Sequence, residues 1–378
     1  MAGWLDALEG SARTRAKAGL NRRLRPRSAA DQIVDLAGND YLGLAVHPAV
    51  IAAAASALSA YGLGATGSRL VRGSTQVHAA LETALASWLG AAGALVYSSG
   101  YLANLGAVRA LTGPGTLIIS DAYNHASLID GCKLSGAETV VAPHASPSAV
   151  AALLDSHAGR PAVVVTESVF SVDGDLAPLA ELHQVTSARG ALLLVDDAHA
   201  LGLLGPSGAG GVAAAGLAGA PDVVVTATLS KSLGGAGGVI AGPDALIRHL
   251  VDTGRTFIYD TAPPPTVVAG VRAALDIARA ADDRRAVLRT RAALTVSRLA
   301  AAGFEVRMPA GAVLSVPAPG PEAALAWAAD CRDRGVAVGG FRPPSTPDGT
   351  SRLRLTLNAG VSAAEFARAL DVIVECAP

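Results

Sequence analysis

The chain has 378 residues, of which 51% are hydrophobic and 16% are charged, and its formal net charge is −1. This length and composition predict a globular protein with a large core in two domains, and they exclude a disordered chain. The near-neutral charge gives no electrostatic basis for binding nucleic acid or an anionic membrane surface.

Cysteine usage and the N-terminal sequence indicate where the protein works. Cys132, Cys331 and Cys376 are widely spaced and form no CxxC pair, so we expect neither a metal site nor a disulfide framework. The first residues lack the basic-then-apolar pattern of a signal peptide, and no uninterrupted apolar run is long enough to span a bilayer. These features predict a soluble, cytoplasmic protein.

The first 45 residues are interpreted as an N-terminal helical segment. Residues 1–38 are rich in arginine, and most of these arginines are typical of a solvated helix face.

Between residues 46 and 265, Ala-rich helical stretches alternate with short, continuous apolar runs. The predicted helices are 50–60, 76–89, 102–111, 147–156 and 178–188, and the predicted strands are 94–97, 117–119, 162–165, 191–195 and 223–225. Strands that are apolar without alternation are buried on both faces. Their alternation with helices predicts a large α/β domain with a parallel sheet between helical layers.

A smaller α+β domain is expected over residues 266–378. It begins with a long helical region at 266–302, which follows three consecutive prolines. The further predicted strands are 304–307, 312–316, 336–338 and 352–355, and the further helices are 321–333 and 362–376.

Polar residues follow each strand of the larger domain. Parallel sheets bind ligands beyond the carboxyl ends of their strands, so these residues are expected to share one crevice. They lie in the segments 98–101, 121–127, 166–175, 196–199 and 228–231. Any one of them could be only a helix cap, a turn residue or a core histidine. All of them together indicate a ligand site.

Lys231 is the most informative residue of this set. Only three of the 30 lysine and arginine residues are lysine. Arginine cannot replace lysine where a neutral amine must attack a carbonyl, since the guanidinium stays protonated. A chance surface lysine is the alternative, but the surrounding residues favour a Schiff-base lysine.

Pyridoxal phosphate is the cofactor that these residue types predict. It needs an amine, here Lys231, and a carboxylate at the ring nitrogen, here Asp196. His125 is expected to stack on the ring and His199 to hydrogen-bond its phenolic oxygen. Donors for the phosphate are expected at the helix start formed by Gly100 and Tyr101, and at Thr228.

The chain resembles the α-oxoamine synthases, a branch of the fold-type I pyridoxal phosphate enzymes. The resemblance covers nearly the whole chain and lies in the motifs NDYLGL (39–44), GSRL (67–70), HASL (125–128), VFSVDG (169–174), DDAH (196–199) and TLSK (228–231). It implies a mainly parallel sheet sandwiched by helices, with a smaller C-terminal α+β domain. It also implies that an amino acid is joined to an acyl thioester with loss of carbon dioxide.

Within this family, the segments 341–345 and 349–356 are similar to the subgroup that condenses L-alanine with a pimeloyl thioester. Relatives that use glycine tend to carry an apolar residue at the position of Arg342. Ser345 stands where the subgroup usually has threonine. Asn21 lies near the position of a substrate-binding arginine, so the resemblance assigns that role to Arg22 or Arg23.

The resemblance implies a role for each of the remaining site residues. Lys231 would bind the cofactor and then remove the α-proton of alanine, and His125 would help to position the thioester. Asn39 and Arg352 would hold the alanine carboxylate. Ser171, with His199, would contact the ring oxygen of the cofactor. Thr261 would reach the phosphate of a neighbouring subunit, which implies a homodimer with shared active sites.

Two other functions remain open at this point. One is a sibling enzyme that joins glycine to an acetyl thioester, and the other is a pyridoxal phosphate carrier or regulatory domain without catalysis. Arg342 and the N-terminal arginines favour a long acyl chain that ends in a carboxylate. Asn39, His125 and Arg352 argue against a mere carrier, because a carrier has no need to hold an amino acid.

Overall fold

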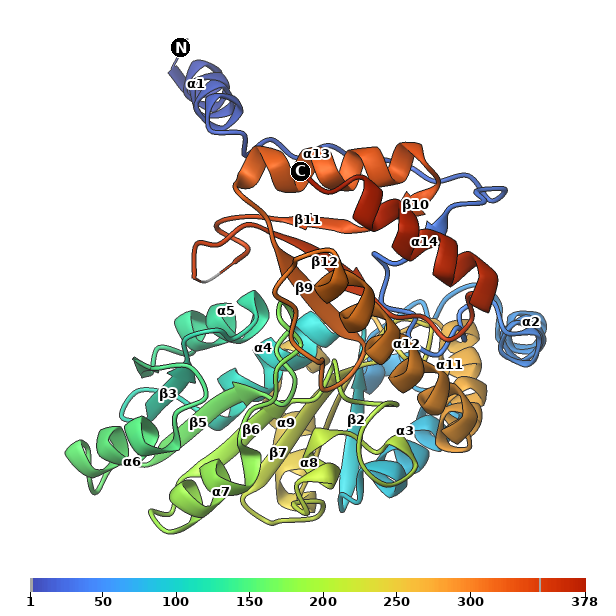
Figure 1. Ribbon diagram of the computed structural model, residues 1–378. Helices are drawn as coiled ribbons and strands as arrows, with labels where there is room; N and C mark the ends of the chain where they lie inside the picture. Colours follow the sequence, from blue (N-terminus) through green and yellow to red (C-terminus); the bar gives the residue numbers. More distant parts are fainter. Residues whose placement is uncertain (1–2, 347) are drawn as a thin grey trace.

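The computed structural model describes residues 3–346 and 348–378. Its centre is a seven-stranded sheet in the order β2-β8-β7-β6-β5-β3-β4, in which β8 is antiparallel to both its neighbours and the other pairs are parallel (Figure 1). The strands are β2 (Gly93–Tyr97), β3 (Leu117–Asp121), β4 (Glu138–Ala142), β5 (Ala162–Glu167), β6 (Leu192–Asp196), β7 (Val223–Thr228) and β8 (Gly238–Gly242).

Both faces of this sheet are covered by helices. On β5, Val163 and Val165 pack into one apolar cluster and Val164 into the other, as the alternation of side chains along a strand requires. Helices α4 (Gly100–Leu111), α5 (Ala126–Ser135), α9 (Asp244–Thr253) and α10 (Arg255–Ile258) contribute to the first cluster. Helices α2 (Pro48–Tyr61), α3 (Gln76–Leu89), α6 (Pro147–Ser156), α7 (Leu179–Ser187), α8 (Gly211–Ala214) and α11 (Pro265–Arg279) contribute to the second. The predicted α/β fold is therefore confirmed.

A second layer is built mainly from the C-terminal part of the chain. It holds a three-stranded antiparallel sheet in the order β11-β12-β9, with helices beside it (Figure 1). Its elements are α12 (Asp282–Ala301), β9 (Val313–Pro317), α13 (Pro321–Asp333), β10 (Val336–Ala337), β11 (Gly339–Phe341), β12 (Arg352–Thr356) and α14 (Ala363–Glu375). The predicted boundaries at 46 and 266 remain an interpretation.

The N-terminal segment is less helical than predicted. Helix α1 (Gly3–Lys17) buries none of its residues and stands away from the body in Figure 1. After it the chain runs in irregular conformation to β1 (Val34–Asp35), which pairs in parallel with β10. The N-terminal segment is thus joined to the C-terminal layer through backbone hydrogen bonds.

Several elements differ from the prediction for identifiable reasons. Residues 304–307 form no strand, because no strand in the described part of the chain pairs with the free edge of β9. The Phe304 ring packs instead on that of Trp327, with centroids 5.3 Å apart. Strand β8 was missed because it begins and ends with glycine, and β4 because it is largely exposed at the sheet edge. No helix among the described residues is long and apolar enough to cross a membrane.

Gly174 joins the two layers, and its replacement tests that junction. Its φ is +71°, and a Cβ there would lie 2.0 Å from the carbonyl oxygen of Val313 in β9. We expect Gly174→Ala to lower the free energy of unfolding by about 3 kcal/mol or more, from left-handed strain and the clash together. Chemical denaturation measures this loss.

Gly136 provides the matched control. Its φ is +74°, but a Cβ there would meet no atom within 4 Å. Gly136→Ala should therefore cost only the backbone term of about 1 kcal/mol. Equal losses in the two variants would show that the contact with Val313 is unimportant.

Candidate active site

The carboxyl ends of β5, β6 and β7 bring together the residues around Lys231. Lys231 follows β7, and its Nζ lies 2.7 Å from Nε2 of His199. Asp196 and Glu167 are the last residues of β6 and β5 and are partners in the sheet register. Three predicted residues, Lys231, His199 and Asp196, therefore meet at one edge of the sheet.

The environment of Lys231 favours the neutral amine. Burial lowers the pKa of Lys231 to about 8, although the carboxylates of Asp196 and Glu167 act in the opposite direction. Burial and the neighbouring Lys231 also depress the pKa of His199 far below its usual value, so its imidazole stays uncharged. A neutral amine is the reactive form of a lysine nucleophile.

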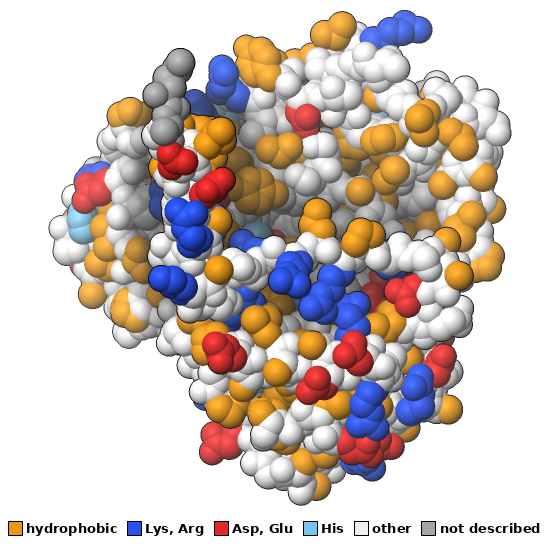
Figure 2. Space-filling view, turned by 90° about the horizontal axis from the view of Figure 1, so that it is seen from above, with side chains coloured by type: hydrophobic (Ala, Val, Ile, Leu, Met, Phe, Trp, Pro, Cys, Tyr) orange, Lys and Arg blue, Asp and Glu red, His pale blue; other side chains and the backbone are white. Residues whose placement is uncertain are grey.

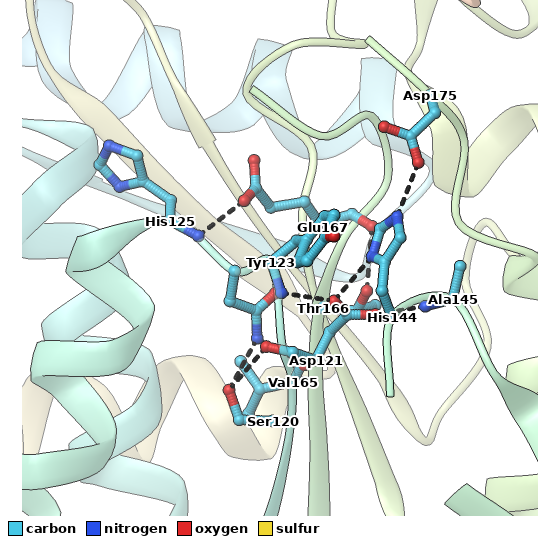
Figure 3. Close-up of polar contacts among 11 residues, drawn as sticks. Ser120, Asp121, Tyr123, His125, His144, Ala145, Val165, Thr166, Glu167 and Asp175 are labelled. Atoms are coloured by element: carbon cyan, nitrogen blue, oxygen red, sulfur yellow. Dashed lines mark hydrogen bonds and ion pairs between the residues drawn. The ribbon is translucent and has the colours of Figure 1, made fainter. Parts of the chain in front are cut away.

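His125 is held in a fixed orientation beside this lysine. Its Nδ1 lies 2.7 Å from the hydroxyl of Ser127, and its backbone N–H donates to Oε1 of Glu167 at 2.6 Å (Figure 3). Burial lowers the pKa of His125, with partial opposition from Asp196. The imidazole is therefore neutral. Its position is fixed by the loop after β3, which carries His125, and by Glu167 at the end of β5.

Asn104, on α4, orients the carboxylate of Asp196. Its amide nitrogen donates to Oδ2 of Asp196 at 2.7 Å and to Ser127 at 2.8 Å, and its oxygen accepts from Thr226 at 2.5 Å. Asn104 was not among the predicted site residues, although an amide on the apolar side of a helix was a usable signal.

The start of α4 forms a narrow cradle against Thr228. A Cβ on Gly100 would lie 2.9 Å from Cβ of Thr228, so only glycine fits there. Ser99 caps the helix by accepting from the N–H of Leu102 at 3.1 Å. The N–H groups of the first helical turn, at Gly100 and Tyr101, lack intrahelical acceptors and are suited to an anion.

These residues fit the predicted cofactor. An amine, an oriented carboxylate, a neutral imidazole and an anion cradle are the groups that pyridoxal phosphate requires. The close approach of Gly100 to Thr228 brings the N–H groups of the helix start and the Thr228 hydroxyl together, and these are donors that a phosphate could accept from. Thr261, expected to serve a neighbouring subunit, is exposed and lines a separate cavity of about 280 Å³ with Ser98 and Thr66.

Arg354, and not Arg352, lies beside Asn39. Nη2 of Arg354 donates to Oδ1 of Asn39 at 3.3 Å, and its Nε donates to the carbonyl oxygen of Ser171 at 2.8 Å. Tyr41 connects this group to the lysine, because its hydroxyl donates to Asn39 at 3.0 Å and lies 2.7 Å from Nδ1 of His199. Arg354 and Tyr41 were not among the predicted site residues.

Arg352 lies elsewhere, which corrects its expected position next to Asn39. Its guanidinium donates to both carboxylate oxygens of Asp348, at 2.7 and 2.5 Å, and its Nε lies 2.8 Å from Asp173. Arg352 and Arg354 share one face of β12, but two residues along a strand are about 7 Å apart. The sequence motif contains both arginines and does not distinguish them.

The residues predicted to bind the acyl chain line a cavity of about 750 Å³ between the N-terminal segment and α13. Arg22 donates to the hydroxyl of Ser345 at 3.4 Å, and Arg342 donates to the carbonyl oxygen of Asn21 at 2.8 Å. The cavity is lined by five arginines, namely Arg22, Arg23, Arg25, Arg332 and Arg342, and its described lining includes no carboxylate. Figure 2 shows lysine and arginine side chains gathered on the hollowed face of the molecule that is seen from above.

Phe341 links this cavity to the Asn39–Arg354 pair. Its ring lines the cavity and lies 5.3 Å from the guanidinium carbon of Arg354. The arginine-lined cavity and the Asn39–Arg354 pair are therefore neighbours, which is the arrangement that a substrate with a remote carboxylate requires.

His144 connects two loops of the site through ion pairs that the sequence did not reveal. Its Nδ1 lies 2.9 Å from Asp121, at the end of β3, and its Nε2 lies 2.8 Å from Asp175, in the loop after β5 (Figure 3). The imidazole stacks on Tyr123 with centroids 4.2 Å apart. Burial opposes protonation, but the two hydrogen-bonded carboxylates prevail and raise the pKa of His144 to about 9.

The ion pairs of His144 with Asp121 and Asp175 predict that the free energy of unfolding depends on pH. Because the pKa of His144 rises from about 6.5 in the unfolded chain to about 9, its contribution is complete below pH 6.5 and disappears as the pH rises through 9. Solvent screening reduces this contribution to about 1–2 kcal/mol. The difference in free energy of unfolding between wild type and His144→Gln, measured from pH 6 to 10, should show this decline.

His183→Gln is the control, since His183 has a single carboxylate partner, Asp222, at 2.9 Å. It should cost less stability than His144→Gln at pH 6. A difference between wild type and His144→Gln that stays constant to pH 10 would contradict the paired-carboxylate account.

Comparisons with known proteins agree with the fold and with the predicted cofactor. The aminotransferase class I and II family matches residues 31–373. An 8-amino-7-oxononanoate synthase of Mycolicibacterium gilvum is 52% identical over 372 residues, which cover 98% of this chain and 96% of that protein.

Two groups of solved structures share the fold over nearly the whole chain. A serine palmitoyltransferase variant from S. paucimobilis with a bound PLP–myriocin aldimine has a TM-score of 0.90 and 32% identity, and the match covers 98% of this chain and 96% of that one. An 8-amino-7-oxononanoate synthase from Francisella tularensis has a TM-score of 0.78 and 27% identity, covering 91% and 97%. The chain therefore belongs to the aminotransferase class I and II family and, within it, to the fold-type I α-oxoamine synthases.

Proposed function

We propose that this protein condenses L-alanine with a pimeloyl thioester and releases carbon dioxide, free thiol and 8-amino-7-oxononanoate, a reaction of biotin biosynthesis. The observation that carries the proposal is the arginine-lined cavity next to Asn39 and Arg354, which fits an acyl chain ending in a carboxylate. The 52% identity to an 8-amino-7-oxononanoate synthase over almost the full length supports the same reaction.

Pyridoxal phosphate, when bound, supplies an electron sink for the negative charge that develops at the α-carbon of the amino acid. Lys231 and Asp196 would hold it by their amine and carboxylate, and the N–H groups of Gly100 and Tyr101, with Thr228, would hold its phosphate. His125, Ser171 and His199 would contact its ring, and Thr261 of a neighbouring subunit would reach the phosphate.

Alanine is bound through its carboxylate. Arg354 and Asn39 are proposed to hold that group, because a guanidinium matches a carboxylate in two parallel hydrogen bonds. Arg354 and Tyr41 are both buried, and this burial keeps water away from the proposed contact with the carboxylate. Lys231, with its lowered pKa, then removes the α-proton and returns a proton to the product.

The acyl donor occupies the other side of the site. Arg342 and Arg22, with Ser345, are proposed to hold the remote carboxylate of the pimeloyl chain, and His125 positions the thioester carbonyl. An acetyl group has no remote carboxylate to bind to these arginines, which disfavours 2-amino-3-oxobutyrate coenzyme A ligase. A carrier without catalysis is disfavoured because Asn39 and Arg354 form a site for the amino acid itself.

A homodimer with shared active sites is proposed from exposed apolar residues on α2, in the segment 69–73 and directly after α10. Ile51 and Leu58 on α2 are 53% and 46% exposed, and Val71 and Tyr259 are 85% and 72% exposed. Large exposed apolar patches mark protein interfaces. The cytoplasmic location remains a prediction of the sequence.

Steady-state kinetics with two substrate pairs test the reaction. We expect kcat/KM with L-alanine and a pimeloyl thioester to exceed that with glycine and an acetyl thioester by at least about a hundredfold, since only the pimeloyl chain carries a remote carboxylate that the arginines of the cavity can bind. The reverse preference would assign the protein to the glycine-using enzymes. Cofactor binding without turnover of either pair would favour the carrier.

Lys231→Ala tests the role of the amine. We expect the variant to lose the visible absorption that pyridoxal phosphate gains from its bond to a lysine, and to lose at least about a thousandfold in kcat. Lys133→Ala is the control, because Lys133 is exposed on α5 and should keep both properties. Retention of the absorption band and of turnover by Lys231→Ala would refute the assignment.

A further inference from the structure

We propose that Arg352 is a positioning residue that anchors the acyl-binding loop to the large domain and thereby sets the affinity for the acyl thioester, without binding the amino acid. The acyl-binding loop is defined as residues 342–346 and 348–351, between β11 and β12. The inference rests on the proposed function, because it assigns Arg342 and Ser345 of this loop to the acyl chain.

The hydrogen bonds of Arg352 close the loop onto its own strand. Nη1 and Nη2 donate to the two carboxylate oxygens of Asp348 at 2.7 and 2.5 Å, and Nη1 also donates to the carbonyl oxygen of Thr350 at 2.8 Å. Both acceptors belong to the loop. A bidentate guanidinium–carboxylate pair fixes direction as well as distance.

The remaining contact crosses to the other layer. Nε of Arg352 lies 2.8 Å from Oδ1 of Asp173, in the loop that follows β5, and Ser315 on β9 donates to the same carboxylate. Asp173 lies two residues after Ser171, whose carbonyl oxygen accepts from Arg354. Arg352 therefore ties the acyl-binding loop to the segment that also supports the cofactor ring.

The guanidinium has little capacity left for a substrate. Its side chain is only 10% exposed, and four of its five N–H donors are engaged by Asp348, Thr350 and Asp173. The guanidinium holds the pKa of Asp348 far below its ordinary value, so this carboxylate stays charged and paired. A carboxylate of alanine would have to displace these partners.

The other end of the loop reaches the arginine-lined cavity. Arg342 donates to the carbonyl oxygen of Asn21, and Ser345 accepts from Arg22. A loop anchored at Asp348 presents Arg342 and Ser345 in one arrangement, which reduces the ordering entropy that acyl binding must overcome. Loosening the anchor should weaken binding of the acyl donor and leave the alanine site intact.

Arg352→Lys and Arg354→Lys form a matched pair of variants on one strand face. For Arg352→Lys we expect KM for the pimeloyl thioester to rise about tenfold, because a single ammonium cannot replace the bidentate pair. The dissociation constant for L-alanine, measured from the absorption change of the holoenzyme without an acyl donor, should stay within about twofold. For Arg354→Lys we expect the reverse: the dissociation constant for L-alanine should rise, and KM for the pimeloyl thioester should change little.

Hydrogen–deuterium exchange provides a readout that does not depend on turnover. Arg352→Lys should raise the exchange of amides in the acyl-binding loop while that of β12 stays at the wild-type level. Asp348→Asn, which leaves Arg352 and the strand unchanged, should raise exchange in the same amides and raise KM for the thioester. This second variant keeps the test valid if Arg352→Lys folds poorly.

Three outcomes would overturn the inference. A loss of alanine affinity in Arg352→Lys as large as in Arg354→Lys would make Arg352 a ligand of the amino acid. Unchanged loop exchange in both anchor variants would show that the ion pair does not hold the loop. Raised exchange with an unchanged KM for the thioester would show that the loop does not set acyl affinity. Failure of wild type to use the thioester would refute the proposed function, and the exchange experiment would still test the anchor.

Discussion

The structure depends on keeping one amine, that of Lys231, buried at the edge of a parallel sheet with a lowered pKa. An unpaired buried cation is costly, and a firmly paired one would be a poor nucleophile. The carboxylates of Asp196 and Glu167 partly offset the burial, and the neutral imidazole of His199 accepts a hydrogen bond from Nζ. The parallel sheet makes this balance possible, because neighbouring strands end at the same edge.

A chain of hydrogen bonds connects the surroundings of Lys231 in the large domain with the N-terminal segment and the C-terminal layer. Nδ1 of His199 meets the hydroxyl of Tyr41, which donates to Asn39, and Asn39 accepts from Arg354. Tyr41 and Asn39 precede the first helix of the large domain, and Arg354 lies on β12. The proposed site for the amino-acid carboxylate therefore needs both the N-terminal segment and the C-terminal layer in place.

Much of this arrangement could be predicted from the sequence, because the signals were local. The apolar runs of β3, β5, β6 and β7 read as buried strands, and the scarcity of lysine singled out Lys231. Tertiary contacts were less visible. His144 meets Asp121 and Asp175 only through folding. Arg352 and Arg354 point to the same side of one strand, so their partners decide their roles, and no pattern in the sequence names those partners.

Two arginines on one strand face allow the requirements of the two substrates to be separated. Arg354 faces Asn39 and the lysine, and Arg352 faces Asp173 and the acyl-binding loop, at positions about 7 Å apart. A change in the loop can alter the acyl cavity without moving Arg354, because β12 is held by its own ladder to β9 and β11. If Arg352 anchors the loop as proposed, substitutions in the loop would alter the acyl cavity while the residues around Lys231 stay fixed.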